Sequence, residues 1–149
     1  MSKIEIFPMT EENYRIVAII AKENLAEAWS EETYFKQISN PNDHTYLACF
    51  DGKPAGFLSM WYVAGEVEIN NIAVSESFRR KGVAKALFSA ACKDIPSEAD
   101  WFLEVRKSNS AAVSLYENMG FKVGGTRRNF YSDPTEDALI MVKKHCGPL

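Results

Sequence analysis

Apolar and polar side chains in the first forty residues follow patterns that predict one strand and then two helices. Ile4 to Pro8 indicates a short strand, and residues 10–28 carry apolar side chains every three or four positions. That spacing predicts an amphipathic helix, for which Thr10 is a suitable N-cap. Ser30 opens a second helix, which should end before Asn40-Pro41 because proline disfavours a helical residue ahead of it.

A change of parity marks the middle of the chain. Val67 and Ile69 are apolar at odd positions, whereas Ile72 and Val74 are apolar at even positions. A strand can keep one face buried through such a change only if it gains an extra residue. We therefore predict a β-bulge near Asn70-Asn71; the alternative is that the strand ends there and restarts.

Turn residues divide the rest of the chain into extended and helical segments. Asp51-Gly52 is typical of a tight hairpin, Pro96 ends a helix that starts at Gly82, and Gly120 suits the C′ position of a helix capped by Ser108 or Asn109. The predicted strands cover residues 45–50, 55–63, 101–105, 121–123 and 138–142. Hairpins first and strand–helix–strand units later predict an α+β fold, with helices on both faces of a mixed sheet, in one domain spanning residues 1–149.

Charge and composition narrow the function. The net charge of −3 argues against a nucleic-acid binder, and no apolar run approaches the ~20 residues that span a bilayer. The N-terminus has no signal-peptide pattern, so we expect a cytoplasmic protein without a membrane partner. Acidic residues gather in the N-terminal fifth and basic residues at 79–85, a distribution that suits two ligands of opposite charge.

The sequence offers no metal-binding pattern. Cys49, Cys92 and Cys146 are far apart and form no Cys-x-x-Cys pair, so reduced thiols are expected. His44 and His145 lie near opposite ends of the chain. We therefore predict no metal site.

A basic, glycine-containing loop stands between a predicted strand and a predicted helix. The first turn of a helix has free backbone N–H groups, and glycine allows an anion to approach them. Cationic side chains beside it would complete a pyrophosphate cradle; the alternative is a solvated basic loop, and these residues alone do not decide. The segment is Arg79-Arg80-Lys81-Gly82-Val83-Ala84.

This loop, together with the strand before it, resembles a known signature. Ile72-Ala73-Val74 followed by Arg79-Arg80-x-Gly82-x-Ala84 is similar to the acetyl-coenzyme A motif Q/R-x-x-G-x-G/A of GCN5-related N-acetyltransferases. The stretch from Leu103 to Phe121, with Glu104, Asn109 and Tyr116, resembles the second half of that family. Trp29-Ser30, Arg127 to Tyr131 and Glu136 to Ala138 narrow the likeness to bacterial ribosomal-protein-alanine N-acetyltransferases of the RimI type.

The resemblance implies a sheet of about seven strands that splays at its centre, with acetyl-CoA in the gap. The cofactor's pyrophosphate would lie on the amides of residues 80–85, which include Lys81, Val83 and Lys85, and Ile72 to Val74 would contact the pantetheine arm. In the family a bulge on this strand helps to present an amide to the thioester carbonyl. Asn109 would also contact the cofactor; its other interpretation is a plain N-cap.

Aminolysis of a thioester needs a base for the amine and an acid for the departing thiol. Glu104 interrupts the apolar run 101–105, where a carboxylate needs a reason; pairing with an arginine is the alternative role, and Glu68 is the rival base. Tyr116 is the candidate acid, since a phenol keeps its proton at neutral pH; its alternative role is an ordinary core residue. Both assignments rest on the resemblance.

The resemblance also implies an acceptor. Tyr131 and Glu136 fall in the region that lines the peptide side in the similar enzymes. The leading hypothesis is acetylation of an N-terminal alanine, with a small-subunit ribosomal protein as the partner. The rivals are a small amine such as a polyamine or aminoglycoside, and a non-catalytic acyl-CoA binding module.

Overall fold

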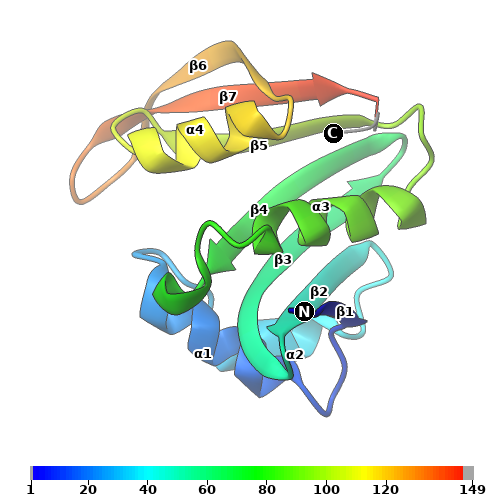
Figure 1. Ribbon diagram of the computed structural model, residues 1–149. Helices are drawn as coiled ribbons and strands as arrows, with labels where there is room; N and C mark the ends of the chain where they lie inside the picture. The colour runs from blue at the N-terminus through cyan, green and yellow to red at the C-terminus, as the bar shows by residue number, and fades with distance from the viewer. Residues whose placement is uncertain (1, 146–149) are drawn as a thin grey trace.

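The computed structural model describes residues 2–145, which form one seven-stranded mixed sheet (Figure 1). Its strand order is β1-β2-β3-β4-β5-β7-β6, and every neighbouring pair is antiparallel except β4 and β5. The strands are β1 (Ile4–Pro8), β2 (Asp43–Phe50), β3 (Lys53–Val63), β4 (Glu66–Val74), β5 (Asp100–Arg106), β6 (Lys122–Tyr131) and β7 (Glu136–Lys144). The predicted α+β class is confirmed.

Helices cover both faces of the sheet, as predicted. The helices α3 (Val83–Asp94) and α4 (Ser110–Asn118) lie on one face, in front of the sheet in Figure 1, and α1 (Tyr14–Asn24) and α2 (Glu31–Gln37) lie on the other. Side-chain alternation along the strands divides the core accordingly. The larger apolar cluster packs beneath α3 and α4, and a smaller one, which includes Tyr34 and Phe57, packs beneath α1 and α2.

The two central strands stop pairing with each other halfway along their length. β4 and β5 pair in parallel only from Glu66 opposite Asp100 to Ile69 opposite Leu103. Beyond that point β5 continues beside β7 alone, while β4 continues beside β3 alone. Figure 1 shows β4 and β5 diverging toward the end where α3 and α4 begin. The predicted central splay is therefore present.

The predicted bulge lies where this divergence starts. Ser59 of β3 pairs with Asn71, but the next residue, Met60, pairs with Ile69, so that Asn70 is the extra residue. The parity change in the sequence had this cause, and the alternative of a broken strand is wrong. Ile69 and Ile72 consequently point into the same apolar cluster.

The first helix is shorter than its apolar pattern predicted, and Thr10 is not its cap. The side chain of Asn13 accepts from the Thr10 amide and donates to the Pro8 carbonyl, which fixes a turn ahead of the helix. At the other end, the Asn24 side chain donates to the Ile20 carbonyl, and the helix stops. Ser30 does cap α2 by accepting from Thr33, as predicted.

The remaining boundaries follow the sequence with two extensions. Asn109 caps α4 by accepting from the Ala112 amide, and Gly120 follows the helix with φ +95°. Strands β6 and β7 are longer than predicted, and their pairing is irregular between Arg127 and Tyr131.

The two described cysteines differ in their redox state. Cys49 carries a free thiol, whereas Cys92 takes part in a disulfide, so the expectation of reduced thiols is wrong for Cys92. Cys146 lies outside the described residues. Within residues 2–145, no helix has the length and apolar character to cross a membrane.

Candidate active site

The open end of the splay exposes backbone polar groups of β4. Within residues 2–145, Asn71 to Val74 pair with β3 on one side and Asn70 is the bulged residue. None of these residues has a strand partner on the other side, because the ladder with β5 stops at Ile69. The side-chain amide nitrogens of Asn70 and Asn71 are also buried, and neither has a hydrogen-bond partner in the described part of the chain. Unpaired polar groups in a partly enclosed site are costly, so this edge is suited to a ligand that supplies the missing partners.

The loop after β4 leads directly into the N-terminus of α3. Gly82 precedes the helix with φ +85°, and Arg80 also has a positive φ, +62°. Among the described residues, the amides of residues 80–85 donate to no protein acceptor. A Cβ at Gly82 would meet nothing within 4 Å, so the backbone here opens onto unfilled space. Free amides at a helix start beside a glycine fit a pyrophosphate.

The four basic side chains of this loop differ in their surroundings. Arg79 is anchored: its Nε donates to the Val74 carbonyl at 3.0 Å, and its Nη2 to the Asn24 side chain at 3.4 Å. Lys81 lies over the Phe50 ring at 5.6 Å. Arg80 and Lys85 make no ion pair among the described residues. Arg79 thus ties the loop to β4, while Arg80 and Lys85 are available to an anion.

Glu104 lies on β5 just past the point where β4 diverges. Its side chain is 16% exposed, and one oxygen stands 3.7 Å from Nη1 of Arg127 on β6. The other oxygen, Oε2, is buried and accepts no hydrogen bond within residues 2–145. The alternative role of pairing with an arginine therefore accounts for one oxygen, and leaves the second free to accept a proton.

The rival carboxylate, Glu68, belongs to the same cluster. Glu68 pairs across the sheet with Phe102, two residues before Glu104, so both carboxylates project from the same face. Burial and the negative charge of Glu104 raise the pKa of Glu68, and Arg127 partly offsets this. The structure thus brings together two residues that the sequence offered as alternatives.

Tyr116 approaches from the opposite face. It lies near the end of α4, it is buried, and it packs in the cluster that contains Leu103 and Val105. Its ring lies 6.0 Å from that of Phe121, and its hydroxyl makes no hydrogen bond within residues 2–145. Burial, with a smaller contribution from Tyr131, raises the pKa of Tyr116 above its ordinary value. Glu104 and Tyr116 can therefore act on one molecule only through the gap between β4 and β5.

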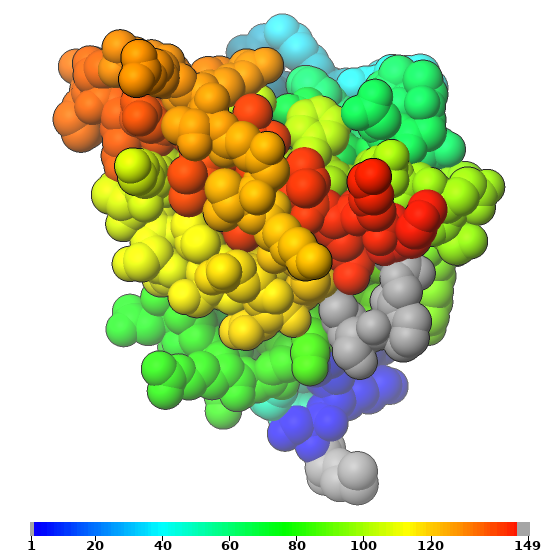
Figure 2. Space-filling view, turned by 90° about the horizontal axis from the view of Figure 1, so that it is seen from above, coloured from blue at the N-terminus to red at the C-terminus, as the bar shows by residue number. Residues whose placement is uncertain are grey.

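Arg106 connects the two loops that flank this gap. Its guanidinium pairs with Glu27, which lies in the α1–α2 loop, and donates to the carbonyls of Ser132 and Pro134 in the β6–β7 connection at 3.1 and 3.0 Å. It also lies over the Tyr131 ring at 4.4 Å. Viewed from above in Figure 2, the β6–β7 connection (orange) stands at one corner of the surface.

Glu136 completes this network rather than pointing freely outward. Its Oε2 accepts from the Ser108 amide at 2.6 Å, and its Oε1 lies 3.4 Å from Arg106. These contacts lower the pKa of Glu136, with the Ser108 bonds contributing most. Tyr131 is half-buried beside it. Tyr131 and Glu136 pair at the β6–β7 connection, and their role toward the acceptor stays a prediction.

Sequence reasoning assigned no role to Arg106 or Glu27. Arg106 shares the face of Glu104 by simple alternation, which was a usable signal. Glu27 had no such signal, because 79 residues separate it from Arg106. As for metals, the described residues contain no group of three or more His, Cys, Asp or Glu side chains arranged to hold an ion.

A splayed sheet with a free-amide loop at a helix start defines a class of acyl-CoA-dependent transferases, and comparison with known proteins agrees. The model of the Acetyltransferase (GNAT) family matches residues 10–121, so this chain belongs to that family. It is therefore an acetyl-CoA-dependent N-acetyltransferase, and the rival of a non-catalytic module is set aside. The predicted fold, family and cosubstrate are confirmed.

The names of individual relatives are more specific than the family name. The chain is 33% identical over 144 residues to a putative bS18-alanine N-acetyltransferase of Bacillus subtilis, covering 94% of this chain and 95% of that protein. It is 37% identical over 119 residues to the [ribosomal protein bS18]-alanine N-acetyltransferase of Escherichia coli K12, covering 76% and 78%. The crystal structure of the ribosomal-protein-S18-alanine N-acetyltransferase from Escherichia coli aligns with a TM-score of 0.85 at 29% identity, over 99% of this chain and 97% of that one.

Proposed function

We propose that this enzyme acetylates the α-amino group of an N-terminal alanine, and that its acceptor is the small-subunit ribosomal protein bS18. The observation that carries this proposal is the 33% identity to the Bacillus subtilis relative over nearly the whole of both chains. A ribosomal acceptor would be met in the cytoplasm, which is part of the same proposal.

Acetyl-CoA supplies an acetyl group already activated as a thioester. The amides of residues 80–85 would hold its pyrophosphate, with Arg80 and Lys85 nearby, and the free edge of Ile72 to Val74 would hold its pantetheine arm. Asn109 uses its side-chain oxygen to cap α4, so its amide nitrogen remains for the cofactor. These are the roles that the sequence predicted for these residues.

Glu104 is the base in this proposal. Its buried Oε2 has no hydrogen-bond partner among residues 2–145, so it can accept the proton of the incoming amine directly or through one water. Arg127, 3.7 Å from the other oxygen, orients the carboxylate without occupying both lone-pair faces. Glu68 stands on the same face but one strand away from the β5–β7 pair.

Tyr116 is the acid in this proposal. Because burial raises its pKa, its hydroxyl keeps its proton until negative charge develops on the departing sulfur. It donates from the face opposite Glu104, so the acid and the base do not exchange a proton directly with each other.

The two candidate amines differ in how easily they become neutral. An α-amino group has a pKa of about 8 and a lysine about 10.4, so at pH 7 the neutral α-amine is more available by a few hundredfold. A single carboxylate base is therefore better matched to a protein N-terminus than to a lysine side chain.

The test is thiol release with an Ala-initiated peptide, run beside the same peptide blocked at its N-terminus and carrying a lysine. We expect acetylation of the free N-terminus only. In Glu104→Gln, activity at pH 7 should be lost and partly regained toward pH 9, because the α-amine then deprotonates without help. Full activity of Glu104→Gln at pH 7 would return the base to Glu68, and activity confined to polyamines or aminoglycosides would favour the small-amine rival.

A further inference from the structure

A carboxylate flanked by aromatic rings lies beside the proposed amine position and takes no part in the mechanism above. Glu68 of β4 is directly opposite Trp61 of β3 and beside Phe102 of β5. Side chains at paired positions project from the same face of a sheet, so the carboxylate lies between an indole and a phenyl ring. All three side chains are only partly buried and are open to a ligand.

The aromatic wall is fixed by its own contacts. Trp61 stacks on Trp29 with ring centroids 5.9 Å apart, and its Nε1 donates to the Gln37 side chain at 2.9 Å. Trp29 in turn lies 5.5 Å from the Tyr34 ring. The indole of Trp61 is thus held in place before any acceptor arrives.

The charge beside this wall is not neutralised within the protein. Glu68 makes no hydrogen bond and no ion pair among the described residues, and Arg127 is the cation that Glu68 and Glu104 share. Two carboxylates against one guanidinium leave the site with a net negative charge. The proposed mechanism assigns the carboxylate of Glu104 to the α-amine. The carboxylate of Glu68 therefore remains for a second cationic group.

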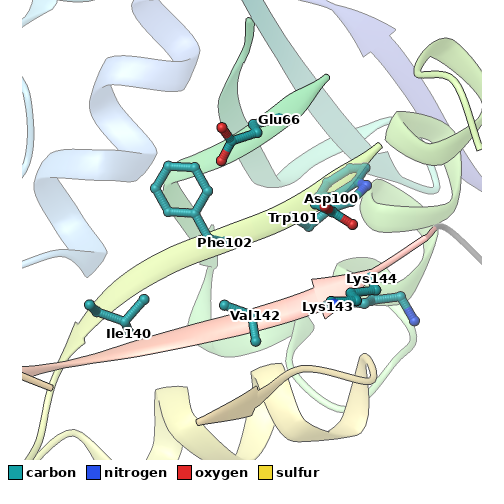
Figure 3. A pocket seen from close by; sticks show the side chains of 8 residues that line it. All are labelled: Glu66, Asp100, Trp101, Phe102, Ile140, Val142, Lys143 and Lys144. Atoms are coloured by element: carbon teal, nitrogen blue, oxygen red, sulfur yellow. The ribbon is translucent and has the colours of Figure 1, made fainter. Parts of the chain in front are cut away.

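A hollow of about 350 Å³ lies farther along the same strands, and its charged lining residues are two carboxylates and two lysines: Glu66, Asp100, Lys143 and Lys144. Phe102 and Val142 line it, together with Ile140, which pairs with Glu104. Figure 3 shows the Phe102 ring projecting toward β4, where Glu66 lies, with Ile140 and Val142 on β7 beyond it. Phe102 therefore borders both Glu68 and this hollow, whereas Glu68 and Glu104 do not line it.

We propose that Glu68, Trp61 and Phe102 form a subsite for a basic side chain at the second position of the acceptor. This inference rests on the proposed function. Glu104 and Phe102 are two residues apart on β5, which is about 7 Å along the strand. A lysine or arginine next to the N-terminal alanine of the acceptor can span that distance. The cationic head lies against the indole face and the Glu68 carboxylate, while its methylene stem packs on Phe102.

The experiment compares matched Ala-initiated peptides whose second residue is Arg, Gln or Glu, by thiol release under kcat/KM conditions. With the wild-type enzyme we expect a preference for Arg over Gln of about tenfold, and a larger one over Glu. In Glu68→Gln the preference should shrink to within about twofold, mainly through KM for the Arg peptide. Glu98→Gln, which changes an exposed carboxylate in the turn before β5, is the control and should keep the preference.

Other outcomes separate this inference from the function on which it rests. If wild-type enzyme acetylates all three peptides equally, the subsite is refuted and the proposed function stands. If Glu68→Gln loses the same factor on every peptide, Glu68 serves the reaction itself and the subsite is again refuted. If no free N-terminus is acetylated, the proposed function fails first. Trp61→Leu, checked for folding by its melting curve, should also weaken the Arg preference; an unchanged preference would exclude the indole.

Discussion

The face of the sheet covered by α3 and α4 is packed with apolar side chains, whereas the face covered by α1 and α2 holds polar groups inside its core. Thr45 and Ser59 are buried on the second face, hydrogen-bonded to each other, and Thr45 also donates to Asp43. On the first face, Leu87, Phe88 and their neighbours form an uninterrupted apolar cluster. The comparison fits the proposed mechanism, in which backbone groups held by an apolar platform bind the cofactor while side chains act on the acceptor.

The largest effect should come from the one functional side chain on the apolar face. Tyr116→Phe keeps the packing and removes the hydroxyl, so kcat should fall by ~10²–10⁴ while acetyl-CoA affinity is nearly unchanged. Stopped-flow and steady-state thiol-release assays measure kcat, and calorimetry measures the affinity for acetyl-CoA. Tyr62→Phe, which removes another phenol from the same face, is the control. Near-normal turnover of Tyr116→Phe would make Tyr116 an ordinary core residue.

The next effect tests whether cofactor binding depends on backbone. Gly82→Glu would place a negative side chain beside the amides of residues 80–85, and we expect acetyl-CoA affinity to fall by about 100-fold or more. Gly82→Ala is the matched control, because it brings the same positive-φ strain without bulk or charge. Calorimetry on both variants separates strain from repulsion, and equal affinities would remove the phosphate cradle from this loop.

A smaller effect is expected from the link between the acceptor loops. Arg106→Gln breaks the contacts with Glu27 and with the carbonyls of Ser132 and Pro134, so the loops lose their fixed spacing. We expect KM for an Ala-initiated peptide to rise by about tenfold, with acetyl-CoA affinity unchanged. Arg128→Gln, an exposed arginine on the same hairpin, should behave as wild type. A loss of cofactor affinity in Arg106→Gln would contradict the separation of the two faces.

The smallest expected effect is on the free energy of unfolding, and it comes from Asp43 on the face covered by α1 and α2. Burial raises the pKa of Asp43 from 3.8 to about 6, although the Thr45 hydrogen bond opposes the shift. A raised folded-state pKa means that the charged form weakens the fold, so stability should grow as pH falls from about 6 toward 4. Asp43→Asn should therefore stabilise the protein at pH 7.5 by about 1–2 kcal/mol, after discounting for partial exposure, and change little at pH 4. Urea unfolding at both pH values measures this, and a destabilised variant at pH 7.5 would refute it.

Local features of the chain were readable from sequence because their causes are local. The bulge at Asn70 followed from apolar parity, and the caps at Ser30 and Asn109 from residue type. The early end of α1 was missed because side-chain bonds of Asn13 and Asn24 override an apolar pattern that continues past them.

The site was readable only in part. The cofactor loop is one continuous segment with a motif, so its position was predicted. The proposed acceptor side is assembled from residues far apart in the chain, such as Glu27 with Arg106 and Trp61 with Glu68. Such pairs depend on strand register and loop approach, which a single sequence does not encode in any short pattern. Opposite-face placement of Glu104 and Tyr116 likewise required the sheet.

The unpaired half of β4 has a consequence for the life of the protein in the cell. An open strand edge is a template on which other chains can add, and proteins usually cover such edges. In the proposed mechanism the cover is the cosubstrate itself, because acetyl-CoA in the splay would supply partners to the free edge of Asn70 to Val74. A ligand that binds only the folded state stabilises it by an amount that grows with its concentration. The enzyme's resistance to aggregation and proteolysis should therefore follow the metabolic supply of acetyl-CoA, so that starvation removes the protein as well as its activity.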